Sequence, residues 1–204
     1  MSVSRAETLL ALAAAERVRL RRHLLVAAAL REVLGQEPIV VGGTAEEFHS
    51  AAPYHETDLD LCGWVTAEER RVLRALGFRR RGRHWFDDAS KVAVEFPDSR
   101  IEGDEGRVER VKVSSGTAAI IGVDDLYLDR LRQATTQTSE ESVEFRSALA
   151  VAAGALERVD RRYVLRRIRA IERADPSLGR RMRNADSRIR VRVRKTLSRG
   201  SGRV

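Results

Sequence analysis

The spacing of hydrophobic positions changes several times along the chain, and each change predicts a new element of secondary structure. Residues 5–34 contain no proline or glycine and are rich in alanine, leucine and arginine, which predicts one or two helices that end at Gly35. The apolar run 38–41 stops at two glycines, as a buried strand does when a tight turn follows it. Residues 58–62 alternate polar and apolar side chains, so we expect a strand with one buried face there.

Several helix starts can be predicted from capping residues. Thr44 and Thr66 each stand three residues before a glutamate, which is the spacing of a capping box, and the second of these helices should end at Gly77. Asp124 and Ser139 are expected to cap two later helices. The remaining predicted elements are strands over 91–96, 108–113 and 118–121 and a helix over 159–174.

The last part of the chain is strongly basic. Residues 158–204 carry 17 of the 38 Lys and Arg residues but 4 of the 30 Asp and Glu residues, a net charge of +13, which leaves −5 for residues 1–157. Within this part, residues 188–194 alternate arginine with isoleucine or valine like a strand, and we expect the run to be weakly ordered without a partner.

Such a charge has three interpretations. The first interpretation is a polyanionic partner such as RNA or tRNA. The second is an amphipathic helix whose arginines face water, and these two interpretations can hold at once. An anionic membrane surface is the third. The candidate nucleic-acid contacts are Arg188, Arg190, Arg192 and Arg194.

Composition argues against several classes of protein. No segment approaches the roughly 18 consecutive apolar residues of a transmembrane helix, so no membrane span is expected. The N-terminal stretch is interrupted by charges, unlike a signal peptide, and we expect a cytoplasmic protein. Cys62 is the single cysteine and has no partner for an intramolecular disulfide, so we interpret it as strand packing.

Three acidic residues in predicted strands are candidates for metal binding. Asp58 and Asp60 stand two residues apart, so both carboxylates project from one face of their strand. Close carboxylates repel each other unless a cation neutralises them, and Mg²⁺ (or Mn²⁺) suits oxygen ligands. Glu95 could add a third carboxylate from a separate strand, and three such acids can hold two metal ions for phosphoryl displacement. The alternatives are a solvated edge strand for the pair and an exposed strand end for Glu95.

The segment Gly42-Gly43-Thr44 joins the first strand to a helix. A glycine turn lets backbone N–H groups approach a phosphate closely at the start of a helix, and the Thr44 hydroxyl can donate to it. The same residues also suit a plain helix cap in which Thr44 pairs with Glu47.

Four further features have both a structural and a functional interpretation. His55 and His84 are interpreted as loop or packing residues rather than catalytic groups. Trp85 is interpreted as part of the core or a pocket wall, with base stacking as the alternative. The arginine-rich segment 79–83 is either a solvated loop or a contact for triphosphate or nucleic acid.

In this order, the motifs resemble those of the nucleotidyltransferase superfamily of the DNA polymerase β type. That pattern is an apolar strand, two small residues that open a helix, an acid-x-acid strand, and a third acid on a later strand. Here it reads over residues 40–44, 57–61 and 94–96, and residues 123–131 resemble the acidic helix start of small bacterial AbiEii-type proteins.

The resemblance covers residues 38–132 and implies an α/β fold with a mixed sheet flanked by helices, an N-terminal helix and a helical, basic C-terminal part. The expected segments are an N-terminal helical segment 1–35, a nucleotidyltransferase-like core 36–133, a helical part 134–176 and a basic tail 177–204.

The activity that the resemblance implies is metal-dependent transfer of a nucleoside monophosphate from an NTP to a hydroxyl of RNA, tRNA or protein. A lysine found downstream in toxin-type relatives is replaced here by Arg130. The alternative is a non-catalytic protein of the same fold, in a toxin–antitoxin or regulatory role, that binds RNA or a protein partner such as an antitoxin. A small-molecule transferase is disfavoured by the cationic tail. The implied residues are Asp58, Asp60 and Glu95 for metal and catalysis, and Gly42, Gly43, Thr44 and Arg130 for the nucleotide.

Overall fold

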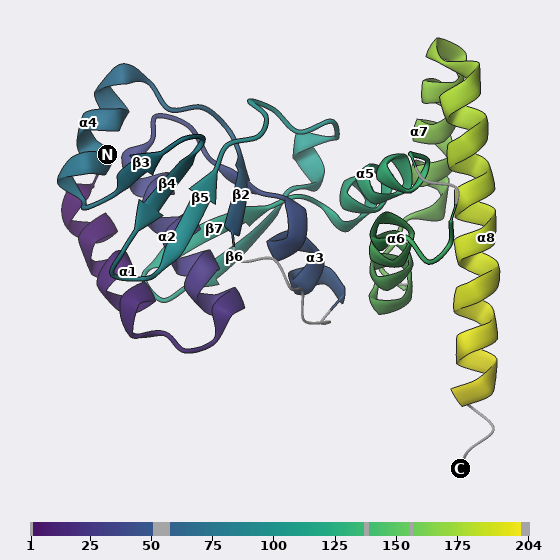
Figure 1. Cartoon of the computed structure of the whole chain (residues 1–204), viewed down its shortest axis with the longest axis horizontal. Helices are drawn as coiled ribbons and strands as arrows, with labels where there is room; N and C mark the ends of the chain where they lie inside the picture. The colour runs from purple at the N-terminus through teal and green to yellow at the C-terminus, as the bar shows by residue number, and fades with distance from the viewer. Residues whose placement is uncertain (1, 51–57, 137–138, 156, 201–204) are drawn as a thin grey trace. The chain divides into compact units, whose positions relative to one another are not determined.

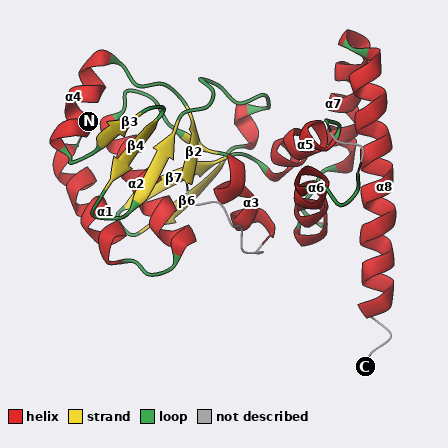
Figure 2. Cartoon of the chain, viewed as in Figure 1, coloured by secondary structure: helices red, strands yellow, loops and turns green. Residues whose placement is uncertain are grey.

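The computed structural model describes residues 2–50, 58–136, 139–155 and 157–200, and the chain forms two compact units. Unit 1 comprises Met1–Phe48 and Pro53–Gly122, and unit 2 comprises His49–Ala52 and Val123–Val204. Unit 1 combines helices with a sheet, whereas the described part of unit 2 is helical (Figures 1 and 2). Within the described ranges, every helix is too short or too polar to span a bilayer.

A mixed, seven-stranded sheet forms the centre of unit 1. In spatial order its strands are β3 (Arg79–Arg81), β4 (His84–Asp87), β5 (Val92–Glu95), β2 (Asp58–Cys62), β1 (Ile39–Val40), β7 (Gly116–Ile120) and β6 (Glu109–Val113). β5 runs parallel to β2 and β7 parallel to β1, whereas the other neighbouring pairs are antiparallel. The predicted α/β class with a mixed sheet is therefore confirmed.

Two helices, α1 (Val3–Ala15) and α2 (Arg19–Val33), occupy the predicted N-terminal helical region. α2 packs on β7 and α1 packs on α2. Gly116 of β7 allows this close approach, because an added Cβ there would lie 2.9 Å from a methyl of Leu9. One face of β2 and β5 also packs into the core, where Leu59 and Val94 are fully buried. Burial of each such side chain contributes about 1.5–3 kcal/mol.

The helix that follows β1, α3 (Gly42–Ser50), begins two residues earlier than the predicted cap. Its first turn is closed by the N–H of Ala45, which donates to the carbonyl of Val41. The cap interpretation of Thr44 is wrong, because Thr44 lies inside this turn and its hydroxyl contacts His23 of α2. Gly42 permits the early start, since its φ of +61° is strained for residues with a side chain.

The capping box at Thr66 is confirmed at the start of α4 (Ala67–Ala75), where Thr66 and Glu69 bond each other's backbone N–H groups. Gly77, with φ +95°, follows the helix as predicted. The segment 79–83 was not expected to be a strand, but β3 and β4 form a hairpin around Gly82. A short 3-10 helix, η1 (Glu105–Arg107), precedes β6.

Unit 2 contains four helices in its described residues: α5 (Val123–Ala134), α6 (Val143–Gly154), α7 (Arg161–Ala174) and α8 (Pro176–Gly200). Two predicted caps are wrong. Asp124 lies within α5 and accepts a hydrogen bond from the N–H of Asp160, at 2.7 Å. Ser142, rather than Ser139, caps α6, because its hydroxyl reaches the N–H of Phe145.

The strand-like run at residues 188–194 is helical, which corrects both the predicted strand and the predicted weakly ordered tail. α8 buries side chains at helical spacing, among them Met182, Ile189 and Val193, and it packs against α5, α6 and α7. Val191, which a strand would place beside Ile189, is 49% exposed. Arginine forms helices readily, so packing on unit 2 overrides the two-residue alternation.

Buried polar contacts hold α8 to its neighbours. Asp186 is buried and accepts hydrogen bonds from both terminal nitrogens of Arg161, at 2.7 and 2.5 Å, and from the hydroxyl of Tyr127, at 3.0 Å. Burial, reinforced by Asp186, raises the pKa of Tyr127. A buried carboxylate is stable only with such partners, so this contact specifies where α8 docks.

The two compact units divide the chain differently from the four predicted segments. The N-terminal helices belong to the same unit as the sheet, because α2 covers β7 and β6. α5, which was expected in the core segment, belongs to unit 2 together with the basic α8.

Candidate functional site

The predicted acids lie on one face of the central strands of unit 1. β2 and β5 pair in parallel, with Asp58 opposite Ala93 and Asp60 opposite Glu95. Because side chains alternate along a strand, this register places all three acids on the face opposite the buried leucines and valines. β2 lies between β5 and β1, which rules out the solvated edge strand as an interpretation of the aspartate pair.

A cluster of three potential ligands, Asp58, His84 and Glu95, forms on this face. The Nε2 atom of His84 lies 3.3 Å from Oδ2 of Asp58 and 3.2 Å from Oε2 of Glu95. One ligand atom from each residue lies within 4.8 Å of the other two. The side chain of Glu95 is 12% exposed, which excludes the exposed strand end as its interpretation.

His84 is the residue that sequence reasoning missed. It was interpreted as a loop or packing residue, but it begins β4, where the antiparallel register with β5 places it beside Glu95. The sequence offers one indication: polar His84 stands next to apolar Trp85, which is buried. This alternation places the two side chains on opposite faces only once β4 is recognised as a strand. Trp85 itself is buried in the core, as expected.

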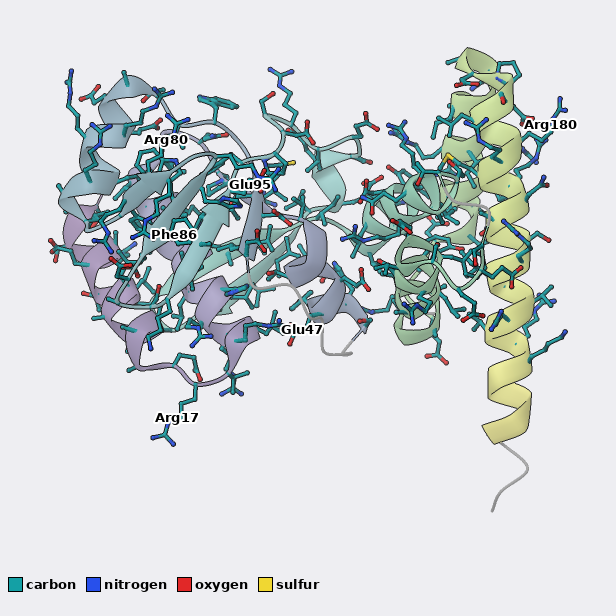
Figure 3. The ribbon with its side chains drawn as sticks, in the orientation of Figure 1. Arg17, Glu47, Arg80, Phe86, Glu95 and Arg180 are labelled. Atoms are coloured by element: carbon teal, nitrogen blue, oxygen red, sulfur yellow. The ribbon has the colours of Figure 1, made fainter. Side chains whose placement is uncertain are left out.

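An arginine from the hairpin turn adds positive charge to the cluster. The Nε of Arg83 lies 3.1 Å from Oε2 of Glu95, and its side chain is 74% exposed. Such an exposed guanidinium is largely screened by water and contributes little to neutralising the carboxylates. Other arginines of the hairpin lie over rings instead: Arg80 over Trp85 and Arg81 over Phe86. Of these, Arg80 and Phe86 are labelled in Figure 3.

Asp60 faces the start of α3. A Cβ built on Gly42 would lie 2.1 Å from Oδ2 of Asp60, so the carboxylate directly abuts the glycine backbone. The N–H of Val41 also donates to the carbonyl of Asp60, at 3.0 Å. The acid-x-acid strand and the glycine turn are therefore in contact. A metal ion held by the acids and a phosphate held by the turn would need to lie this close together.

Thr44 and His23 form a buried pair behind the turn. The Thr44 hydroxyl lies 2.8 Å from Nδ1 of His23, and both residues are buried. Burial, with Arg19 and Arg22 nearby, lowers the pKa of His23 from 6.5 to about 4, so the imidazole is neutral at pH 7. A neutral imidazole can either donate to Thr44 or accept from it, and this choice decides whether the hydroxyl proton is available to a ligand.

The remaining candidates have other surroundings. Arg130 lies on α5 of unit 2, where its side chain is 7% exposed and Nη1 donates to Gln133 at 2.7 Å. Cys62 is buried at the end of β2, in agreement with its interpretation as packing. His55 lies outside the described residues.

The four arginines predicted to contact nucleic acid do not form one row. On a helix, Arg188 and Arg192 share one side, and they form ion pairs with Glu140. Arg190 and Arg194 lie on another side of α8.

This arrangement can hold a divalent cation and a phosphate next to each other. Carboxylates supply oxygen ligands and His84 a nitrogen, while the first turn of α3 provides backbone N–H groups beside Asp60. Together they could neutralise the charge that develops when a phosphoryl group is transferred.

Comparison with known proteins gives a structural similarity without a sequence match. No family model matches the chain, and no curated protein matches it. The structure is similar to the crystal structure of an antigenic nucleotidyltransferase-like protein from Paracoccidioides brasiliensis, with a TM-score of 0.50 and 13% sequence identity. The similarity covers 81% of this chain and 92% of that protein. The chain therefore has a nucleotidyltransferase-like fold.

Proposed function

We propose that this protein transfers a nucleoside monophosphate from an NTP to a hydroxyl group, with RNA as the acceptor. The observation that carries the proposal is the contact between an acid-x-acid strand and the glycine turn of α3, with a third acid beside it on β5. In the reaction, the acceptor oxygen would bond to the α-phosphorus, pyrophosphate would leave, and the hydroxyl proton would pass to a base.

Asp58, Asp60 and Glu95 would hold the Mg²⁺ that this reaction uses. Their oxygens fit the ligands that Mg²⁺ prefers, and they share one face of adjacent central strands. The bound ion would offset negative charge on the phosphate oxygens and on the leaving pyrophosphate. Glu95, at the end of β5, would also assist the acceptor hydroxyl.

The first turn of α3 would bind the nucleotide phosphates through its N–H groups, next to Asp60. Thr44 could add a hydrogen bond only if Nδ1 of His23 carries the proton, because the hydroxyl then accepts from His23 and keeps its own proton for phosphate. The neutral state of His23 makes this tautomer available at pH 7. Arg130 lies on α5 of unit 2, where its Nη1 donates to Gln133, and its proposed contact with the triphosphate rests on the sequence resemblance alone.

RNA is the favoured acceptor because one helix of unit 2 presents a stripe of exposed arginines. Arg162, Arg166, Arg169 and Arg173 follow one another at four- and three-residue intervals along α7, opposite its buried side chains. Arg180 extends the positive charge onto α8 (Figure 3). Arginines spaced in this way suit a phosphate backbone, whereas unit 1 is close to neutral, with 18 Lys and Arg against 19 Asp and Glu residues.

The test is incubation of the full chain with Mg²⁺, total RNA and NTPs labelled on either the α- or the γ-phosphate. We expect RNA to retain the α-label and not the γ-label, and Asp58→Asn or Asp60→Asn to abolish transfer. Asp98→Asn, at an exposed position, is the matched control and should leave transfer intact. Retention of the γ-label would instead indicate a kinase.

The RNA contact is tested separately with Arg166→Gln/Arg169→Gln. This variant should weaken RNA binding and flatten its salt dependence, by about 0.7–0.9 in log–log slope for each arginine–phosphate interaction that the substitutions remove. Nucleotide binding should be unchanged. Point substitutions are needed because truncation would remove α8, which packs on the other helices of unit 2.

An alternative function follows from the same arginine stripe. A chain that binds RNA through α7 but shows no nucleotide binding would be a non-catalytic member of the fold, in a regulatory or toxin–antitoxin role. A finer relationship to the AbiEii-type proteins remains part of our proposal and rests on the sequence motifs alone.

A further inference from the structure

The imidazole of His84 has an unusual environment within the acidic cluster. Its Nε2 atom is inaccessible to solvent and makes no hydrogen bond, although carboxylate oxygens of Asp58 and Glu95 lie within 3.3 Å. Neither oxygen therefore lies along the direction in which an Nε2–H group would donate. A buried nitrogen in this state is costly unless another group satisfies it.

The distances fit three donors arranged around one ion. Two donors at about 2.1 Å from a metal are separated by about 3.0 Å when they subtend a right angle and by about 3.4 Å at the tetrahedral angle. The separations of Nε2 from Asp58 and from Glu95, at 3.3 and 3.2 Å, lie between these limits. A single cation could thus contact His84 together with both carboxylates.

The donor set determines which cation suits the cluster. Mg²⁺ prefers oxygen ligands throughout, whereas imidazole nitrogen favours first-row transition ions. Two carboxylates also supply more negative charge than the exposed Arg83 can offset, so a divalent cation is favoured over a monovalent one.

We propose that His84 is a metal ligand together with Asp58 and Glu95, and that it biases this site toward a first-row transition ion such as Mn²⁺ over Mg²⁺. The inference deepens the proposed function and rests on it in one respect, namely that the same ion would serve nucleotidyl transfer. Asp60, whose carboxylate abuts Gly42, is not one of these three clustered donors, and its part in the proposed function is unchanged by the addition of His84.

A direct test uses Mn²⁺ alone with the full wild-type chain. Pulsed electron paramagnetic resonance detects a nitrogen atom bound to Mn²⁺ through its nuclear modulation of the spin echo. We expect this nitrogen signal in the wild type and its loss in His84→Gln. Bound Mn²⁺ without a nitrogen signal, or no bound Mn²⁺ at all, would overturn the proposal.

Calorimetric titration with Mn²⁺ and with Mg²⁺ then measures selectivity. His84→Gln replaces the nitrogen ligand by an amide that offers oxygen, so Mn²⁺ affinity should fall about tenfold or more, at least the loss that removal of a ligand's hydrogen-bond partner causes, while Mg²⁺ affinity changes little. Arg83→Gln is the matched control, since Arg83 touches Glu95 without being a ligand, and it should keep the preference for Mn²⁺. Equal loss of affinity for both ions in His84→Gln would contradict a selective role.

Two further results separate this proposal from the proposed function. Nitrogen-ligated Mn²⁺ in a protein that transfers no nucleotide would leave the metal site standing and reject the transferase. Transfer supported by Mg²⁺ in a protein that shows no nitrogen signal would reject His84 as a ligand and leave the transferase standing. Tryptophan fluorescence checks that His84→Gln is folded, because Trp85 is its neighbour on β4.

Discussion

The buried imidazole of His23 should make the stability of unit 1 depend on pH. Burial and the neighbouring arginines lower its pKa from 6.5 to about 4. Between these pH values the unfolded chain binds a proton that the folded chain excludes, so acidification favours unfolding. The contribution of His23 to stability is therefore complete above about pH 6.5 and declines as the pH falls toward 4.

The size of the effect follows from the shift. A pKa difference of one unit corresponds to about 1.4 kcal/mol, so the change from 6.5 to about 4 predicts a loss of about 3 kcal/mol between pH 7 and pH 4. This is a substantial part of the stability of a typical domain, which is about 5–15 kcal/mol.

Urea titrations between pH 4 and pH 7, followed by tryptophan fluorescence, can isolate the contribution of His23 to the free energy of unfolding. Both tryptophans, Trp64 and Trp85, belong to unit 1, so the signal reports on the unit that contains His23. His23→Gln removes the titrating group, and other acid-sensitive groups cancel when the two proteins are compared. The wild type should lose about 3 kcal/mol relative to His23→Gln over this range.

Thr44→Val is the control for this experiment. It removes the hydroxyl bonded to His23 but leaves the imidazole buried, so it should cost about 1–3 kcal/mol at every pH and retain the pH dependence. Parallel stability curves for the wild type and His23→Gln would refute the reasoning, because they would mean that His23 titrates alike in the folded and unfolded chains.

Two other predictions concern the glycine turn and α8. Gly42→Ala should destabilise the chain more than Gly82→Ala. Both glycines have φ near +60°, but only the new methyl group at Gly42 would meet the carboxylate of Asp60. Equal losses of stability for the two variants, measured by urea titration, would show that this contact is unimportant. Ile189→Ala should cost about 2–4 kcal/mol, whereas Val191→Ala, at an exposed position, should cost less than about 0.5 kcal/mol. Similar costs at both positions would favour the strand over the helix.

Local patterns predicted most of unit 1. The alternation in residues 58–62 was found as a strand, and the double glycine was found where the chain passes from β1 into a helix, although α3 already begins at Gly42. The convergence of Asp58 with Glu95 followed from strand parity, since each acid lies next to a buried apolar residue.

The errors arose where distant contacts decide the structure. His84 was missed because β4 is a short strand of four residues that depends on pairing with β3 and β5. The helical state of residues 188–194 could not be read from their two-residue alternation, because it depends on the surface that α5, α6 and α7 present to Ile189 and Val193. Capping sequences were equally ambiguous at Thr44, where contact with His23 replaces the cap.

Metal-dependent binding of a nucleotide is the most direct test of the central claim, that the face formed by β2, β5 and the start of α3 is a nucleotidyl-transfer site. Equilibrium dialysis of labelled NTPs against the full chain should show binding that requires Mg²⁺ or Mn²⁺, and Asp58→Asn should weaken it by at least about tenfold, which corresponds to about 1.4 kcal/mol. NTP binding that is absent in the wild type, or equal with and without metal and unaffected by Asp58→Asn, would contradict the claim.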